Sequence, residues 1–253
     1  MRLLVTGAAG MLGRDVVAAA NDAGHEVVAL ARAELDITDA AAVRAAVLDA
    51  EPEAVINCAA WTDVDGAETH EDAATAVNGT GAGNLAAAAP YLVHLSSDYV
   101  FDGDAREPYP EDAPTAPRSA YGRSKLAGEL AVDSGRAAIV RSSWLFGPHG
   151  RNFVDTMRRV GAERDEIAVV DDQIGCPTYT GHLAPALVTV AERGLTGVLH
   201  VAGAGRCSWF DLAVATFAET GIECRVRPQG TAELGRPAPR PAFSALASTR
   251  SDA

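Results

Sequence analysis

The chain has 253 residues, of which 48% are apolar and 22% are charged, so wholesale disorder and a fibrous protein are both excluded. Its length suits one large domain or two small ones. Asp and Glu outnumber Lys and Arg by 34 to 21, and the net charge of −13 argues against non-specific nucleic-acid binding. No stretch of about 18 uncharged apolar residues occurs, so we expect no membrane-spanning helix.

The amino terminus and the cysteines indicate a cytoplasmic protein. Residues 1–7 contain a charge at Arg2 and become glycine-rich too early for a secretory signal peptide. The four cysteines lie far apart without a CxxC or CxxH pair, which is typical of reduced thiols and not of a zinc site. They are Cys58, Cys176, Cys207 and Cys224.

Six short apolar runs are spaced along the chain, and Ala-rich stretches long enough for helices separate several of them. Strand-length runs that alternate with helices indicate a parallel sheet, and continuous apolarity fits strands covered on both faces. The expected strands are Leu3–Thr6, Glu26–Ala31, Ala54–Asn57, Tyr91–Leu95, Ala137–Arg141 and Val198–Val201. The expected early helices cover 11–23, 39–50, 72–89 and 120–134. The pattern predicts an α/β fold with a doubly wound, Rossmann-type parallel sheet.

The first expected strand runs directly into a glycine-rich turn with the spacing GxxGxxG. Gly7, Gly10 and Gly13 allow a tight turn and close approach of the backbone to a pyrophosphate. The helix that follows offers unpaired N–H groups and a positive dipole end to that anion. Packing alone can also require such glycines, but the position between a first strand and a helix favours nucleotide binding.

The second expected strand ends near Arg32. A carboxylate at this point would pair with the ribose of NAD, whereas a cation accommodates the 2′-phosphate of NADP. Arg32 therefore favours NADPH, and NADH is the alternative if Arg32 is only a solvated surface residue. Asp36 and Ile37 follow in a position to flank the adenine, with Asp36 accepting from its amino group. Asp39 is suited instead to cap the next helix.

The segment Tyr121-Gly122-Arg123-Ser124-Lys125 places a tyrosine and a lysine on one helix face. An ammonium group near a phenol favours the phenolate, so we expect Lys125 to lower the pKa of Tyr121 towards neutrality. Such a phenol suits a proton donor to a carbonyl that receives hydride. Lys125 is also placed to hydrogen-bond a nicotinamide ribose. By chance alone, however, an exposed YxxxK is common.

Ser97 and Asp98 follow the strand expected at Tyr91–Leu95, at the sheet edge where open α/β folds bind ligands. A hydroxyl there would polarise the same carbonyl. The glycine turn, the Ser-Asp pair and YxxxK are each weak alone. In this order they predict the chemistry of a nicotinamide-dependent short-chain dehydrogenase/reductase.

The composition changes in the second half of the chain, where Gly and Pro interrupt further helical patterns at 152–163, 182–193 and 208–220. We therefore expect an NAD(P)-binding domain over residues 1–145 and a smaller C-terminal substrate-binding lobe over 146–253. Segments of the chain are free to cross between these lobes.

Longer motifs resemble the dTDP-4-dehydrorhamnose reductase family of extended short-chain dehydrogenase/reductases over nearly the whole chain. They are NCAAWTDVD at 57–65, SDYVFDG at 97–103, YGRSKLAGE at 121–129, RSSWLFG at 141–147, VDDQIGCPT at 170–178 and RPAFSAL at 240–246. The resemblance implies reduction of the 4-keto group of dTDP-4-dehydro-L-rhamnose by NADPH or NADH.

The resemblance also implies roles for single residues. Tyr121 would donate the proton, and Lys125 would support it and bind the ribose. Ser97, where the family usually has threonine, and Asp98 would contact the sugar. The implied cofactor contacts are Gly10, Met11 and Leu12 at the pyrophosphate, Asp36 and Ile37 at the adenosine, and Ala59, Ala60, Trp61 and Thr62 at the nicotinamide side.

Two further substrate contacts have equally plain structural alternatives. Trp144 would contact substrate, although a tryptophan just after a strand is otherwise a core residue. Asn152 is a substrate candidate that could equally cap the helix after it.

Some members of this family dimerise around a divalent ion such as Mg²⁺, held by carboxylates. Asp15 occupies the place of one of them, where an acidic residue also suits the first turn of a helix. Family members usually continue past the position of Ala253 with another helix, so the C-terminal carboxylates of that site are not expected here. A homodimer and a need for Mg²⁺ are both left open.

Three other functions fit the residues. A reductase of another dTDP-4-keto-6-deoxy sugar would differ only in pocket residues of the variable lobe. A dehydratase or epimerase is disfavoured, because dehydratases carry Thr-Asp-Glu where this chain has Ser97-Asp98-Tyr99. A non-catalytic dinucleotide-binding subunit, like the regulatory subunit of methionine adenosyltransferase, would keep the same fold.

Overall fold

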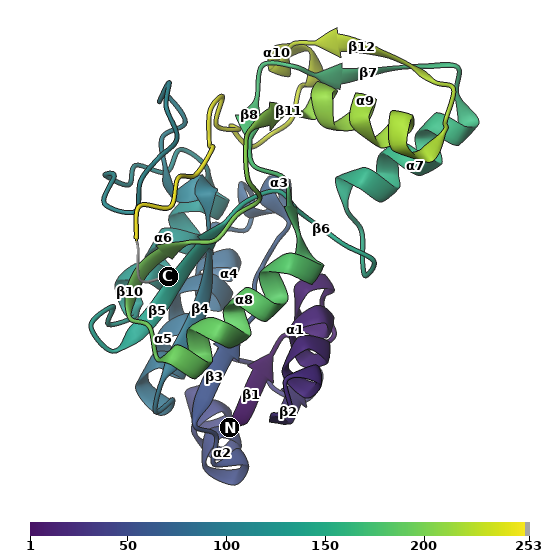
Figure 1. Ribbon diagram of the computed structural model, residues 1–253. Coiled ribbons are helices and arrows are strands. Elements are labelled where there is room, and N and C mark those ends of the chain that lie inside the picture. The colour runs from purple at the N-terminus through teal and green to yellow at the C-terminus, as the bar shows by residue number, and fades with distance from the viewer. Residues whose placement is uncertain (251–253) are drawn as a thin grey trace.

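The computed structural model describes residues 1–250. Its larger lobe contains a six-stranded parallel sheet in the order β10-β5-β4-β3-β1-β2 (Figure 1). From β1 the chain first adds β2 on one side and then adds β3, β4, β5 and β10 on the other, so the direction of strand addition reverses between β1 and β3, as in a doubly wound fold. The strands are β1 (Arg2–Thr6), β2 (Glu26–Leu30), β3 (Ala54–Asn57), β4 (Leu92–Ser97), β5 (Ala137–Ser142) and β10 (Gly197–His200). The predicted fold class and all six predicted strands are confirmed.

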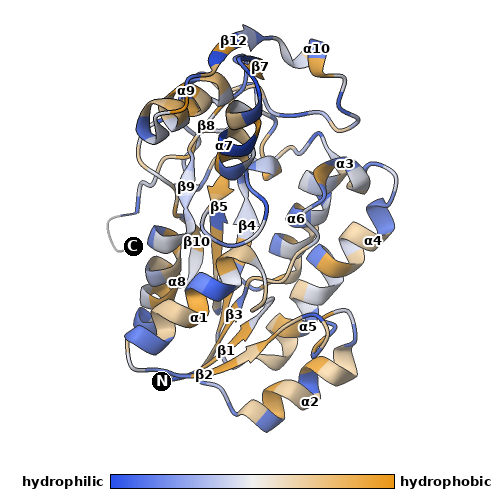
Figure 2. Ribbon diagram, turned by 90° about the vertical axis from the view of Figure 1, so that its right-hand side faces the viewer, coloured by the Kyte–Doolittle hydropathy of each residue, from blue (hydrophilic) through white to orange (hydrophobic). Residues whose placement is uncertain are grey.

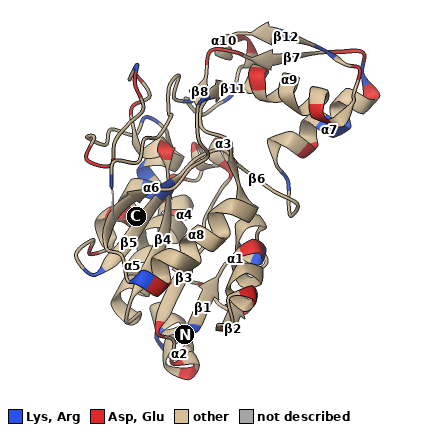
Figure 3. Ribbon diagram, in the orientation of Figure 1, with Lys and Arg blue, Asp and Glu red and all other residues tan. Residues whose placement is uncertain are grey.

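Helices cover both faces of this sheet. Successive strand residues point to opposite faces, so Leu3 and Val5 of β1 join the core beneath α1 and α8. Leu4, between them, joins the core beneath α2 and α5. These helices are α1 (Met11–Asp22), α8 (Thr180–Arg193), α2 (Ala40–Ala50) and α5 (Gly81–Ala88), and α6 (Ala120–Ala131) lies on the α5 side. Figure 2 shows the apolar strands between the two helical layers, and Figure 3 shows most charged residues outside them.

The helix predicted over 72–89 is interrupted. It consists of α4 (Glu71–Thr75), a π-helical turn (Ala76–Thr80) and α5, and a short helix, α3 (Val64–Ala67), precedes it. A π-helical turn inside a helix often marks a functional position, because it turns one side chain out of the regular spacing.

The smaller lobe packs two helices against two paired strands around Ile167, Val169, Ala213 and Phe217. The helices are α7 (Phe153–Glu163) and α9 (Trp209–Thr220), and the strands are β7 (Glu166–Val170) and β12 (Arg225–Gln229). Its short elements are β6 (Leu145–Phe146), β8 (Ile174–Gly175), β9 (Thr178–Tyr179), β11 (Cys207–Ser208) and α10 (Thr231–Leu234).

The chain leaves the small lobe at α8 and β10, rejoins the sheet and then returns to the small lobe at α9 (Figure 1). The two lobes therefore share several chain crossings. The boundary near residue 145 stays a prediction. No helix within residues 1–250 combines the length and the apolarity needed to cross a bilayer.

Candidate active site

A cavity of about 830 Å³ opens at the carboxyl ends of the sheet strands and reaches to the small lobe. Open α/β sheets bind their ligands at this place, and the volume suits a cofactor together with a substrate. Every site residue that the sequence predicted lines this cavity, with the single exception of Asn152. The cavity also has a lining residue from α9, Trp209, which the sequence did not suggest.

The glycine turn forms one end of the cavity. Gly7 has a left-handed backbone, with φ of 67°, and its carbonyl accepts from the Gly10 N–H at 2.9 Å. A Cβ on Gly13 would collide with that carbonyl. No side chain caps α1, and its first turn holds no acidic residue. The turn therefore fits a pyrophosphate, with free N–H groups at the start of α1.

The adenosine end is formed by the residues after β2. Arg32 is exposed at the rim of the cavity, where a cation can meet a 2′-phosphate. Asp36 Oδ1 accepts from the Thr38 N–H at 3.0 Å and from its hydroxyl at 2.8 Å, and these bonds lower the pKa of Asp36. Asp39 caps α2 by accepting from two of its backbone N–H groups, as predicted.

The π-helical turn holds the loop at the nicotinamide end. The Asn78 side chain accepts from the Trp61 N–H at 2.8 Å and donates to the Trp61 carbonyl at 3.1 Å. It also donates to the Ser124 hydroxyl of α6 at 2.9 Å. Asn78 thus joins the Trp61 loop to the helix that carries Tyr121. Asn78 is one of two asparagines, with Asn84, in the Ala-rich stretch at 72–89, and nothing else in the sequence indicated this role.

The phenol of Tyr121 lies beside the hydroxyl of Ser97. Burial and the nearby Asp98 carboxylate raise the pKa of Tyr121 to about 12, against a hydrogen bond with Ser97 that lowers it. The prediction that Lys125 would bring this pKa towards neutrality is therefore wrong, because burial outweighs any effect of the ammonium group. At neutral pH the phenol keeps its proton, and only that form can donate one.

Lys125 lies beneath the cavity floor. Its Nζ donates to the Leu95 carbonyl at 2.7 Å, and burial lowers the pKa of Lys125 to about 8 although Glu129 opposes the shift. Glu129 is itself held by Arg141 through two bonds of 2.9 and 2.7 Å, and it accepts from the Ser96 hydroxyl. This buried network fixes α6 against β4 and β5, and it thereby fixes the position of the Lys125 side chain.

Asp98 lies behind Ser97. The Ser97 hydroxyl donates to Asp98 Oδ1 at 2.9 Å. Asp98 Oδ2 faces the Ser244 hydroxyl, and neither atom has a partner of hydrogen-bonding geometry among the described residues. Burial raises the pKa of Asp98 to about 6. The carboxylate therefore orients the Ser97 hydroxyl.

Two stacked indoles form the wall on the side of the small lobe. Trp144 and Trp209 lie with ring centroids 3.5 Å apart and planes at 5°. Trp144 has an unusual φ of 49°, and its ring occupies the space that a side chain on Gly175 would need. Trp209 Nε1 donates to Gln173 Oε1 at 3.1 Å. The strained backbone turns the Trp144 ring towards the cavity instead of the sheet core.

Asn152 is the exception among the predicted residues. Its side chain accepts from the Asp155 N–H at 2.9 Å, which caps α7, and donates to the Gly147 carbonyl at 2.9 Å. It does not line the cavity. Of its two expected roles, the structure gives it the cap. Arg151, one residue earlier, does line the cavity and brings a cation to its mouth.

Asp15, the residue at the metal position of some family members, lies near a histidine in this structure. Asp15 Oδ1 lies 3.6 Å from His149 Nε2. Within the part of the chain that the structure describes, no three His, Cys, Asp or Glu side chains gather as a metal site. The homodimer and the need for Mg²⁺ both stay open, as the sequence left them.

The family described as the RmlD substrate binding domain matches residues 1–253. The chain belongs to this family. A probable dTDP-4,6-dihydroxy-2-methyloxan-3-one 4-ketoreductase of Streptomyces antibioticus is 49% identical, over 99% of this chain and 88% of that protein. The dTDP-4-dehydrorhamnose reductase of Streptomyces griseus is 47% identical, over 98% of this chain and 86% of that protein.

A solved structure in the same family carries a cofactor. It is the dTDP-4-dehydrorhamnose reductase of Bacillus anthracis in complex with NADP, which is 41% identical to this chain. The two superpose with a TM-score of 0.94, over 97% of this chain and 90% of the other.

Proposed function

We propose that this protein is a reductase that converts the 4-keto group of dTDP-4-dehydro-L-rhamnose to the alcohol of dTDP-L-rhamnose, with NADPH as the reductant. The observation that carries the proposal is the meeting of Ser97, Tyr121 and Lys125 at one end of a cavity whose other end is the glycine turn. The name of the Streptomyces griseus relative, dTDP-4-dehydrorhamnose reductase, supports the same reaction.

The cavity residues fit a bound dinucleotide. The turn at Gly10 would bring the backbone close to the pyrophosphate, the N–H groups of Met11 and Leu12 would bind it, and Arg32 would bind the 2′-phosphate. Lys125 and the Trp61 loop would hold the nicotinamide riboside. When bound, the reduced nicotinamide supplies the hydride.

Tyr121 donates the proton in this proposal. A buried phenol with its proton in place can transfer it to the carbonyl oxygen as that oxygen gains negative charge. The Ser97 hydroxyl, turned from Asp98 towards the same oxygen, provides the second donor. In a site that excludes water, such preorganised donors stabilise the developing charge far more than water would. Lys125 stabilises the phenolate that remains.

The small lobe supplies the sugar-nucleotide side of the site. Trp144 and Trp209 offer an apolar wall to the deoxysugar, and Arg151 a cation to its diphosphate. The proposal also places the protein in the cytoplasm. The four cysteines are free and unpaired with one another, which suits a reducing compartment.

A panel of dTDP-4-keto-6-deoxy sugars with NADPH or NADH tests the substrate. The proposal predicts fastest turnover for dTDP-4-dehydro-L-rhamnose with NADPH. A preference for another dTDP-keto sugar would leave a reductase of different specificity, which is the alternative that the Streptomyces antibioticus relative supports. Tight NADPH binding with turnover of none of the sugars would favour the non-catalytic subunit instead.

A further inference from the structure

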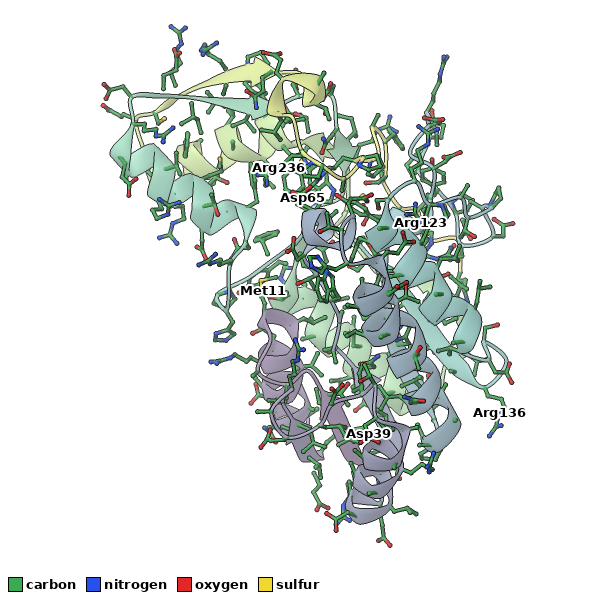
Figure 4. The ribbon with its side chains drawn as sticks, turned by 180° about the vertical axis from the view of Figure 1, so that it is seen from behind. Met11, Asp39, Asp65, Arg123, Arg136 and Arg236 are labelled. Carbon is green, nitrogen blue, oxygen red and sulfur yellow. The ribbon has the colours of Figure 1, made fainter. Side chains whose placement is uncertain are left out.

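The tail after α10 crosses the outside of the active site and is fastened there by one carboxylate. The two Nη atoms of Arg240 contact the two carboxylate oxygens of Asp65, Nη2 at 2.9 Å from Oδ2. Asp65 Oδ1 also accepts from the Ala238 N–H at 3.2 Å. A second cation, Arg236, reaches Asp65 Oδ2 at 3.2 Å (Figure 4). These bonds, with that from Arg240 the strongest, lower the pKa of Asp65 to about 2.

The two arginines differ in burial. The Arg240 side chain is 15% exposed, against 56% for Arg236. A planar guanidinium that binds both oxygens of one carboxylate fixes distance and orientation together, which a single exposed contact does not. Arg240 is therefore the arginine that sets the position of the tail relative to Asp65. Arg236 adds an exposed ion pair of the kind that contributes little to stability.

Asp65 belongs to α3, directly after the loop that carries Trp61 and Thr62. The Asp65–Arg240 pair thus joins the cofactor side of the cavity to the tail. Two backbone bonds hold the tail on its other side: the Phe243 N–H donates to the Gly103 carbonyl at 3.0 Å, and the Ser244 N–H to Ile174 at 2.8 Å.

The same tail touches the neighbours of both catalytic hydroxyls. The Arg240 guanidinium lies beside the Tyr99 hydroxyl, and the Tyr99 ring packs edge-on against Tyr121 with centroids 5.3 Å apart and planes at 80°. Four residues further on, the Ser244 hydroxyl faces Asp98, the residue that holds Ser97. Neither Arg240 nor Ser244 lines the cavity.

We propose that Arg240 is a positioning residue for the proton donor. It is anchored by Asp65 beside the Tyr99 hydroxyl, and the Tyr99 ring in turn fixes the Tyr121 phenol at the reacting carbonyl. The proposal rests on the reductase function proposed above. It assigns to the tail a direct part in the rate of proton transfer and only a small one in dinucleotide affinity, because the glycine turn and Arg32, which would bind the charged phosphates, lie at the opposite end of the cavity.

The test compares kcat for the dTDP-keto sugar with the dissociation constant of NADPH in wild type, Arg240→Ala, Arg240→Lys and Tyr99→Phe. We expect Arg240→Ala to lower kcat by about 10- to 100-fold while NADPH binding changes by less than about twofold. Arg240→Lys keeps a cation for Asp65 but loses the planar guanidinium that binds both carboxylate oxygens. We therefore expect Arg240→Lys to have a melting temperature near that of wild type, but a kcat as low as that of Arg240→Ala. Tyr99→Phe removes only the hydroxyl and lowers kcat with NADPH binding kept.

Arg236→Ala is the matched control, because it removes a neighbouring cation from the same carboxylate; we expect its kcat to stay within about twofold of wild type. Three results would overturn the proposal: an Arg240→Ala variant with wild-type kcat, a loss of kcat that follows an equal loss of NADPH binding, or full recovery of kcat by Arg240→Lys. If Arg240→Ala does not fold, Arg240→Lys and Tyr99→Phe decide.

Turnover by the wild-type protein separates this inference from the reductase function on which it rests. Absence of turnover by the wild-type protein would reject the reductase function itself. Turnover by wild type together with unchanged kcat in Arg240→Ala and Tyr99→Phe would reject only the role of Arg240.

Discussion

Lys125 follows Tyr121 by one turn of α6, yet burial moves the pKa values of the two groups in opposite directions. The ammonium group donates to the Leu95 carbonyl at 2.7 Å, and its pKa is lowered to about 8. The pKa of the phenol is raised to about 12. Near neutral pH the phenol is therefore fully protonated, and the amine is the group that titrates. In the proposed reaction, Tyr121 is the proton donor and Lys125 is the charge that supports it.

This difference predicts the alkaline limb of the pH profile. We expect kcat/KM to fall above about pH 8, because Lys125 loses the proton that gives it its charge, while Tyr121 stays protonated. The measurement is kcat/KM as a function of pH in wild type and in Lys125→Met, which has no group to titrate there. A wild-type profile that stays flat to about pH 10 would assign the ammonium group no role.

The second prediction concerns the phenol itself. Tyr121→Phe keeps the ring and its contact with Tyr99 but removes the proton donor. We expect kcat to fall by about 10²- to 10⁴-fold and NADPH binding to be kept. Tyr91→Phe serves as the control, because the Tyr91 hydroxyl bonds the Leu195 carbonyl away from the cavity. Wild-type turnover in Tyr121→Phe would mean that another group donates the proton.

The third prediction concerns cofactor choice. Arg32→Ala removes the cation at the adenosine end of the cavity, and we expect it to weaken NADPH by about 10- to 100-fold and NADH by much less, because only NADPH has the 2′-phosphate. Titration calorimetry with both cofactors measures this, and the exposed Arg44 of α2 provides the control as Arg44→Ala. Equal losses for the two cofactors would remove Arg32 from the 2′-phosphate site.

The fourth prediction concerns stability. Burial raises the pKa of Asp98 to about 6 in the folded protein, above its ordinary 3.8, so the folded state binds the extra proton between these values. Burying the carboxylate therefore costs stability above pH 6, and this cost disappears as the pH falls towards 3.8. We expect Asp98→Asn to gain up to about 2–3 kcal/mol of unfolding free energy over wild type near neutral pH.

Urea unfolding of Asp98→Asn and wild type at neutral and acidic pH measures this difference. The gain should shrink as the pH is lowered, and the exposed Asp72→Asn should show no such trend. A gain that is independent of pH would mean that the pKa of Asp98 is the same in the folded and the unfolded protein.

The sheet and most of its site were predictable because they depend on local patterns. The six strands are covered on both faces, so each appears as an apolar run, such as Ala54–Asn57 in β3. The carboxyl ends of parallel strands meet at one edge, which places Ser97 and the glycine turn along the same cavity. YxxxK needs only the periodicity of one helix.

The features that were not predicted depend on contacts between distant segments. Asp65 and Arg240 are 175 residues apart, and no local pattern pairs them. Trp209 reaches the cavity only because α9 packs behind Trp144. The break at Asn78 opposes the helical propensity of its Ala-rich neighbours and is stabilised by the Trp61 loop. The pKa of Tyr121 was mispredicted because sequence spacing shows a neighbouring charge but not burial.

The central claim is that Tyr121 protonates the oxygen of a sugar ketone as the ketone is reduced, while the Ser97 hydroxyl hydrogen-bonds the same oxygen. Its most direct test mixes the wild-type protein with NADPH and dTDP-4-dehydro-L-rhamnose, and follows nicotinamide absorbance and the sugar product together. The account predicts one dTDP-L-rhamnose formed for each NADPH oxidised. Recovery of the keto sugar unchanged, with the NADPH still reduced, would contradict it.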